Sequence, residues 1–170
     1  TIALAMSDNQ YTYAELDTVT GQLARWLIDQ GVKPGNLVGI LMPRSVDHVV
    51  ALIAINKAGA AFMSLETSYP EDMLQRFADA SGAKIFLSHS DIIDNLPENI
   101  RQERQWVALD SDWHEQLIDE NIRSNTTPLP VIDPSDMAFL SMSSGTSGAP
   151  KGICQSHRAC VNAYWHRYLK

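Results

Sequence analysis

The chain has 170 residues, of which 45% are hydrophobic and 19% are charged. This size and composition are typical of a soluble globular protein with one substantial hydrophobic core and room for the start of a second. The net charge is -7, from 20 acidic and 13 basic residues scattered along the chain. Because no run of basic side chains could follow a nucleic-acid backbone, we expect no nucleic-acid partner.

The sequence also argues against a membrane segment, a secretory leader and a cysteine-based site. The longest apolar stretch, around Val49 to Ile55, is far shorter than a transmembrane helix, and the N-terminal residues lack the pattern of a signal peptide. We therefore expect no membrane partner and a cytoplasmic location. Cys154 and Cys160 have the spacing of neither a redox pair nor a zinc site, so we expect reduced structural thiols.

The first thirty residues predict a hairpin followed by a helix. Residues 2–6 and 10–13 have strand character on either side of a short polar turn. Thr12 and Glu15 have the spacing of a capping box, and Gly31 is suited to a left-handed helix end. Between them, apolar residues recur at helical intervals at Leu16, Val19, Leu23, Trp26 and Leu27.

A strand-helix-strand unit is predicted next. Leu37–Met42 is a continuous apolar run with the length of a buried strand. Ser45 can cap a helix that ends near Ala58, just before Gly59, and residues 60–65 resume as a strand. A helix from Pro70 to Gly82 and a strand over residues 84–88 continue the alternation.

This alternation predicts an α/β fold, a layered and mostly parallel sheet with flanking helices. Beyond residue 88 the pattern is weaker, with a strand at 106–109, a short helix at 113–122 and a proline-containing connector at 126–134. We place a first α/β subdomain at residues 1–125 and the start of a second at residues 126–170, within an incomplete domain.

An apolar strand at residues 137–142 leads directly into a loop of small, hydroxylated and glycine residues, Ser143 to Gly152. Its glycines permit backbone angles and close approaches that let successive N–H groups turn toward one anion. Its hydroxyl groups add donors, and Lys151 adds a mobile positive charge for phosphate oxygens. Donors and a cation converging on one flexible loop favour a polyphosphate ligand.

Other interpretations of the loop are a polar connector without a ligand, or a different nucleotide motif. Gly and Ser mark loops in general, which keeps the connector open. The P-loop of kinases and NTPases places Ser or Thr directly after a glycine-lysine pair, whereas here Pro150 precedes Lys151 and Gly152 follows it. The dinucleotide-binding GxGxxG pattern is absent as well. An autonomous P-loop enzyme and a dinucleotide enzyme are therefore disfavoured.

The segment Ser144–Gly152 resembles the signature of the adenylate-forming (AMP-binding) superfamily, which includes acyl-CoA synthetases, luciferases and nonribosomal peptide synthetase adenylation domains. Tyr11–Leu16 resembles the opening motif LTYxEL of that family, and Gly35–Ile40 falls where the family has GDxVGI. Asn56–Phe62, followed by Tyr69-Pro70, resembles LKAGxAYVPLDPxYP. Because these motifs occur in the expected order over nearly the whole chain, it is identified as a member of the superfamily.

Within the superfamily, Tyr69-Pro70 and Arg44-Ser45 favour a peptide-synthetase adenylation domain, with an acyl-CoA synthetase as the alternative. Three departures from the family pattern stand out. Ser64–Thr67 replaces Pro-Leu-Asp-Pro, Met142 replaces an aromatic residue, and Ala149 replaces a frequent lysine. All three leave the loop hydroxyls and its remaining lysine in place.

The resemblance implies a ligase reaction. The carboxylate of an amino acid or another carboxylic acid attacks the α-phosphorus of ATP with Mg2+ present, pyrophosphate leaves, and the acyl-adenylate passes to the phosphopantetheine thiol of a partner carrier protein. The loop residues that would hold the ATP phosphates are Ser143, Ser144, Gly145, Thr146, Ser147, Gly148 and Lys151. Such chemistry depends on positioning and charge stabilisation, so none of them is expected to act as a general base.

The family's adenine-contacting segment, its magnesium-binding and ribose-binding carboxylates and its catalytic lysine would all follow Lys170. We therefore expect no catalytic residue and no metal ligand in this chain, which would need the remainder of the adenylation domain and would be inactive alone. The acid that is activated cannot be read from these residues. A non-catalytic nucleotide-binding or interaction module with the same fold is a further alternative.

The remaining candidate residues favour structural roles. His157 could lie near the loop, but with Ser156 as the cap it more simply begins a closing helix. In that helix, near-helical spacing predicts a packing face of Cys160, Val161, Tyr164, Trp165 and Tyr168. The other histidines lack metal-ligand spacing, and we expect them to be solvated or satisfied within the core: His48, His89, His114 and His166.

Overall fold

The computed structural model describes residues 1–6, 9–110, 126–143 and 151–168. The strands in these ranges are β1 Ile2–Met6, β2 Asn9–Thr12, β3 Leu37–Leu41, β4 Ala61–Leu65, β5 Ile85–Ser88, β6 Gln105–Ala108, β7 Met137–Ser143 and β8 Lys151–Ser156. The helices are α1 Tyr13–Asp29, α2 Val46–Lys57, α3 Glu71–Ser81, α4 Ser90–Asn95, α5 Glu98–Arg101 and α8 His157–Tyr168.

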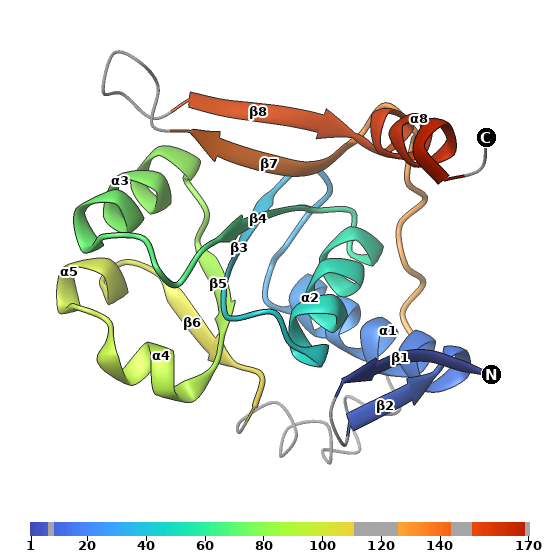
Figure 1. Cartoon of the computed structure of the whole chain (residues 1–170), viewed down its shortest axis with the longest axis horizontal. Helices are drawn as coiled ribbons and strands as arrows, with labels where there is room; N and C mark the ends of the chain where they lie inside the picture. Colours follow the sequence, from blue (N-terminus) through green and yellow to red (C-terminus); the bar gives the residue numbers. More distant parts are fainter. Residues whose placement is uncertain (7–8, 111–125, 144–150, 169–170) are drawn as a thin grey trace.

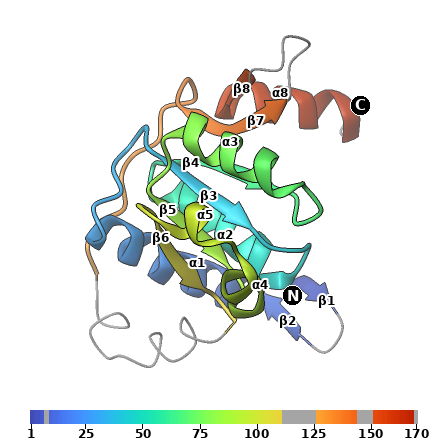
Figure 2. The ribbon, with the colours of Figure 1, turned by 90° about the vertical axis from the view of Figure 1, so that its left-hand side faces the viewer.

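Within the described ranges, six strands form one sheet in the order β6-β5-β3-β4-β7-β8, and β1 pairs with β2 in a separate antiparallel hairpin. Neighbours in the large sheet are parallel, except that β8 runs antiparallel to β7 at the edge. Figure 1 shows helices on both sides of the sheet, and Figure 2 shows the layers from the side. The predicted α/β fold with a mostly parallel sheet is therefore confirmed.

The helix ends follow the predicted capping chemistry. Thr12 Oγ1 accepts a hydrogen bond from the Glu15 N–H at 3.3 Å, and the Glu15 carboxylate accepts one from the Thr12 N–H at 2.8 Å, which closes the capping box of α1. Ser45 Oγ accepts from the His48 N–H at 3.1 Å at the start of α2. Gly82 ends α3 in the left-handed conformation that glycine adopts without strain, with φ at +66°.

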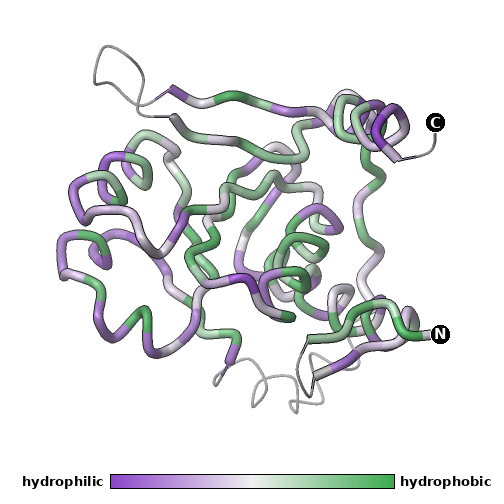
Figure 3. The backbone as a smooth tube through the Cα atoms, viewed as in Figure 1, coloured by the Kyte–Doolittle hydropathy of each residue, from purple (hydrophilic) through white to green (hydrophobic). Residues whose placement is uncertain are grey.

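The hydrophobic core lies on both faces of the sheet. On one face Val38 and Ile40 pack with the buried sides of α1 and α2, whereas on the other Leu41 and Phe86 pack with α3 and α5. Figure 3 shows hydrophobic residues along the central strands and hydrophilic ones on the outer turns of α3 and α5. No helix in the described part of the chain is both long enough and apolar enough to span a bilayer.

The structure differs from the sequence predictions in three places. Residues 151–156 form strand β8 rather than the end of a loop, because they pair with β7. Helices α4 and α5 fill the segment between β5 and β6, where the pattern was weak. The predicted helix at 113–122 lies outside the described residues. The apolar stripe of α8 exists, but its Val161, Tyr164, Trp165 and Tyr168 are exposed rather than packed.

Candidate functional site

The predicted phosphate-binding loop connects the two strands of an antiparallel hairpin. Strand β7 is held against β4, where Phe62 pairs with Phe139 and their rings stack with centroids 5.3 Å apart. Strand β8 pairs with β7 along its length, and this register ends with Ser143 opposite Lys151. Ser143 and Lys151, the first and last of the predicted phosphate-binding residues, therefore face each other where the strands of the hairpin meet the loop. We call this end of the hairpin, defined by Ser143 and Lys151, the hairpin mouth.

Ser143 and Lys151 are both exposed to solvent. The Ser143 hydroxyl donates to the carbonyl oxygen of Lys151 at 3.4 Å, which links the two strands at their ends. The Lys151 ammonium group has no ion-pair partner among the residues that the structure describes. An exposed and unpaired cation at the loop mouth is suited to an anionic ligand.

The other predicted phosphate-binding residues lie outside the described residues: Ser144, Gly145, Thr146, Ser147 and Gly148. Their assignment stays a prediction. Gly152, which we expected to help the backbone approach an anion, has a different role in the structure. A Cβ atom at Gly152 would lie 2.8 Å from Leu140 Cδ1, so the missing side chain lets β8 lie close to a buried leucine of β7.

The mouth of the hairpin lies at the carboxyl edge of the sheet. Strands β3, β4, β5, β6 and β7 are parallel, so their carboxyl ends lie along the same edge of the twisted sheet. In open α/β sheets, ligands bind outside the carboxyl ends of the strands. The fold therefore places Ser143 where this architecture commonly carries its binding site.

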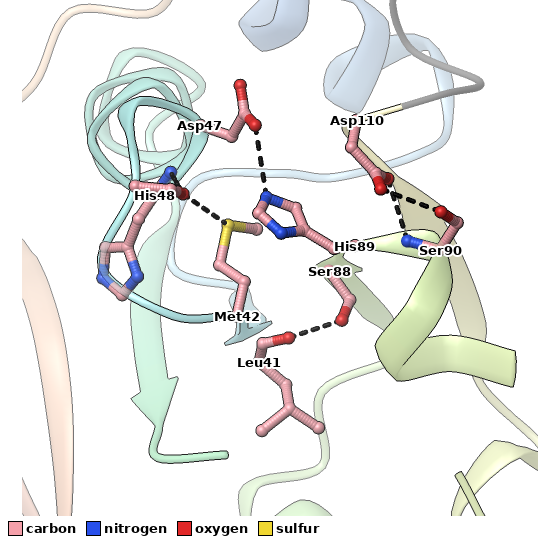
Figure 4. A network of polar contacts seen from close by, with 9 residues as sticks. Leu41, Met42, Asp47, His48, Ser88, His89, Ser90 and Asp110 are labelled. Atoms are coloured by element: carbon pink, nitrogen blue, oxygen red, sulfur yellow. Dashed lines mark hydrogen bonds and ion pairs between the residues drawn. The ribbon is translucent and has the colours of Figure 1, made fainter. Parts of the chain in front are cut away.

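A second group of polar side chains lies at the same edge, beyond β3 and β5 (Figure 4). His89 Nε2, just after β5, lies 3.2 Å from Asp47 Oδ2 in the first turn of α2, and their side chains are 16% and 25% exposed. The Ser88 hydroxyl makes a short hydrogen bond to the carbonyl oxygen of Leu41. These contacts join the end of β5 to the end of β3 and to the start of α2.

Asp110, just after β6, completes this group (Figure 4). Its carboxylate accepts hydrogen bonds from the backbone N–H and the hydroxyl of Ser90, both at 2.8 Å. Partial burial acts to raise the pKa of Asp110, but the two hydrogen bonds from Ser90 and the nearby His89 outweigh it and hold that pKa below its ordinary value. The pair ties α4 to the end of β6.

His89, Asp91 and Asp110 bring potential metal-ligand atoms within 4.8 Å of one another, as the one such group in the described part of the chain. Two of the three already have partners, His89 in Asp47 and Asp110 in Ser90. We interpret the group as a structural network. Sequence reasoning missed it because its members are far apart in the chain and have no motif spacing.

His48 has a different environment from His89. Its Nε2 atom lies 3.4 Å from the Ser64 hydroxyl of β4. Its Nδ1 atom is buried and has no hydrogen-bond partner among the described residues. The expectation that this ring would be solvated or fully satisfied in the core was therefore wrong for its second nitrogen.

Known proteins resemble this chain in sequence over nearly its whole length, which includes the hairpin and the sheet. The chain matches the family of AMP-binding enzymes over residues 1–169. The chain belongs to this family. It is 32% identical over 162 residues to gramicidin S synthase 2 of Brevibacillus brevis, covering 95% of this chain and 3% of that protein. It is 39% identical over 170 residues to glycine betaine reductase ATRR of Emericella nidulans, and the match covers 98% of this chain and 13% of that protein.

Solved structures of adenylate-forming enzymes have the same fold. The peptide synthetase FmoA3, in a form bound to α-methyl-L-serine-AMP, superposes with a TM-score of 0.79 at 28% identity, over 99% of this chain and 18% of that one. The N-terminal subdomain of Klebsiella oxytoca NpsA, in complex with 3-hydroxybenzoyl-AMSN, superposes with a TM-score of 0.75 at 25% identity. This match covers 92% of this chain and 37% of the NpsA chain. The chain thus corresponds to an N-terminal portion of such enzymes and spans only a small part of their length.

Proposed function

We propose that this chain forms the ATP-phosphate-binding part of an adenylation domain, in the cytoplasm, that activates an amino acid or another carboxylic acid. A carboxylate oxygen of the acid forms a bond to the α-phosphorus of ATP, the bond from that phosphorus to the bridging oxygen of pyrophosphate breaks, and acyl-AMP results. The observation that carries the proposal is the hairpin mouth, where Ser143 faces an exposed Lys151 that lacks an ion-pair partner in the described part of the chain.

The proposed role of the hairpin is to hold the β- and γ-phosphates. Lys151 would offset the negative charge that grows on pyrophosphate as it leaves, and the hydroxyls of Ser144, Thr146 and Ser147 would donate to the phosphate oxygens. The Ser143 hydroxyl would do the same by exchanging its long hydrogen bond to the Lys151 carbonyl for one to a phosphate oxygen. The loop is also proposed to fix the triphosphate in line with the attacking carboxylate, using the N–H groups of Gly145 and Gly148.

Magnesium is the expected companion of ATP in this reaction, and it would neutralise phosphate charge when bound. The two described residues at the hairpin mouth offer a hydroxyl and an ammonium group, whereas Mg2+ prefers carboxylate oxygens and water. They therefore fit the phosphates rather than the metal. We propose that the metal ligands belong to the remainder of the adenylation domain.

The remainder of the domain is also proposed to supply the pocket for the acid and the transfer of the acyl group to the phosphopantetheine thiol of a carrier protein. The support is the small share of each relative that the chain matches, 3% of gramicidin S synthase 2 and 18% of FmoA3. The chain on its own is therefore proposed to be inactive. The subdomain boundary between residues 125 and 126 stays part of this proposal.

ATP-pyrophosphate exchange tests the proposal. The test compares the 170-residue chain with a longer protein that also contains the remainder of the adenylation domain. We expect the longer protein to catalyse exchange with at least one acid of a panel of amino acids and other carboxylic acids, and the 170-residue chain to catalyse none. Exchange by the short chain alone would overturn its dependence on the rest of the domain. A folded longer protein that binds ATP without exchange on any acid would instead favour the non-catalytic module.

A second candidate function concerns what happens to the acyl-AMP. The identity of 39% over 170 residues to glycine betaine reductase ATRR favours an adenylation domain that serves a carboxylate reductase. The exchange assay separates the candidates when glycine betaine is included in the panel. Exchange with glycine betaine alone would favour the reductase, and exchange with amino acids would favour peptide synthesis.

A further inference from the structure

The hairpin of β7 and β8, along the top of the view in Figure 1, is joined to the rest of the sheet over a short stretch. Among the described residues, β7 pairs with β4 at one position, Phe62 opposite Phe139, whereas β3 and β4 pair over their full length. Leu140 adds a buried contact on the other face, but apolar attraction is non-directional and sets the position of a strand less sharply than a hydrogen bond does. The hairpin mouth lies beyond this joint.

The side-chain amide of Asn56, in the last turn of α2, lies at this joint. Two backbone carbonyl oxygens face one end of the amide, those of Ala60 just before β4 and of Ala138 in β7. Because carbonyl oxygens only accept, the NH2 end of the amide, with its two donors, is assigned to this side. Its nitrogen then donates to Ala138 at 2.9 Å and to Ala60 at 3.2 Å. One side chain thus holds the start of β7 to the start of β4.

The surroundings of Asn56 make these two hydrogen bonds hard to replace. The two acceptor residues are 0% and 3% exposed, so removing the donor leaves buried carbonyl oxygens without it. The turn between them is tightly packed, since a Cβ atom at Gly59 would lie 3.1 Å from both Pro34 and Pro130. The motif LKAGxAYVPLDPxYP, which this segment resembles, has leucine at the position of Asn56, so the amide is a feature of this chain rather than of the motif.

We propose that Asn56 is a positioning residue for the phosphate-binding hairpin. It fixes β7 against β4, and through β7 and β8 it sets where Ser143 and Lys151 meet the ATP phosphates. The inference rests on the proposed function, because it assigns the hairpin mouth to ATP. At about 3.3 Å per residue, β7 extends about 17 Å from Ala138 to Ser143, so a tilt of about 5° at Ala138 moves the mouth by about 1.5 Å. A misplacement of about 1 Å can lower a reaction rate by about 100-fold.

Amide hydrogen exchange in the longer protein tests the anchor without ATP. Asn56→Leu keeps nearly the same size and removes both donors, whereas Asn56→Asp keeps the shape and sets a carboxylate against the two carbonyl oxygens. In both variants we expect the amides of residues 137–143 to exchange about tenfold faster than in the parent. Ser45→Ala removes the cap at the other end of α2 and is the control, which should leave exchange in these residues close to the parent rate. Parent-like exchange in both Asn56 variants would overturn the proposal.

Pyrophosphate exchange with varied ATP tests whether the anchor acts through the hairpin mouth. Asn56→Leu should lower kcat/KM for ATP by about 10- to 100-fold and leave KM for the acid within about twofold, while Ser45→Ala should change neither. In a Lys151→Ala background, Asn56→Leu should cost no more than about threefold, because the group that it positions is gone.

Losses that multiply fully in the double variant would overturn the positioning role, since they would show that Asn56 acts independently of Lys151. If the parent protein catalyses no pyrophosphate exchange with any acid, the proposed function fails. Hydrogen exchange of residues 137–143 then still decides whether Asn56 anchors the hairpin, because that measurement does not use ATP.

Discussion

Gly39 of β3 lies directly against the ring of Phe86 on the neighbouring strand β5. A Cβ atom at Gly39 would overlap the ring atoms Cδ1 and Cε1 of Phe86. The ring is fully buried and stacks on Trp106 with centroids 4.7 Å apart, so it has no room to move away. The centre of the sheet therefore depends on a glycine at this position.

Replacing Gly39 with alanine should lower the free energy of unfolding by about 1–3 kcal/mol, because the added methyl group overpacks a filled core. Chemical denaturation measures this loss. Gly21→Ala in α1 is the matched control, since the nearest atom to its Cβ is Nη1 of Arg25 at 3.1 Å, at the end of a long side chain whose Nε donates to the Thr127 carbonyl. Alanine there should stabilise the helix by up to about 1 kcal/mol. Phe86→Leu should recover part of the loss in the Gly39→Ala chain, and strict additivity would contradict the proposed clash.

Replacing Ser45 with alanine should lower the free energy of unfolding by about 1 kcal/mol, because the hydroxyl is the N-cap of α2 and accepts from the His48 N–H. Ser45→Asp should keep most of the stability, since a carboxylate also caps and is favoured at a helix N-terminus. Thermal or denaturant unfolding measures both variants. If alanine and aspartate gave equal losses, the cap would not contribute.

Acid should weaken the link between Asp110 and Ser90. The pKa of Asp110 is lower in the folded chain than in the unfolded one, so its contribution to stability is present above the unfolded pKa, about 4, and is lost as the pH falls through the folded value. Asp110→Asn should therefore be less stable than the parent at neutral pH, by less than about 1 kcal/mol because the carboxylate is largely exposed.

Denaturation of both chains at a series of pH values from neutral down to about 3 checks this expectation. The difference between them should shrink in the most acidic samples. Ser90→Ala removes the hydroxyl donor and keeps the backbone donor. It should therefore show the same dependence on pH, with a smaller loss in the free energy of unfolding. A difference that stayed constant over the whole range would contradict the assignment.

In the longer protein, Lys151→Ala and Thr146→Ala should each weaken ATP-dependent turnover. Losing one group that stabilises growing charge lowers kcat by about 100-fold in well-studied sites. Steady-state pyrophosphate exchange with varied ATP measures the effect. Lys33→Ala removes an exposed lysine in the turn before β3, at the opposite edge of the sheet, and should leave the kinetics unchanged. Unchanged kinetics in the Lys151→Ala protein would remove this residue from the site.

Most of the central fold could be predicted from the sequence because its signals are local. The capping box of Thr12 and Glu15 and the left-handed glycine at position 82 each act within a few residues. The apolar run of β3 needs only its own residues to indicate a buried strand. For the candidate site, the glycine and hydroxyl residues are continuous in the sequence, so Ser143 and Lys151 could be predicted to lie at the two ends of one loop.

What could not be predicted depends on contacts between distant segments. Residues 151–156 alternate too weakly to indicate a strand, and only pairing with β7 makes them one. His89 and Asp47 are 42 positions apart and meet because β3 and β5 are neighbours in the sheet. The spacing of α8 indicates an apolar stripe, but spacing alone does not say which surface covers it.

The antiparallel pairing of β7 and β8 also bears on how this protein can evolve. The ladder runs from Met137 opposite Ser156 to Ser143 opposite Lys151, so strand pairing sets which residues face each other at the end of the hairpin. A substitution in either strand that shifts this register by one residue would turn the side chains of that strand to the opposite face. Selection on Ser143 and Lys151 therefore also acts on the pairing of the two strands.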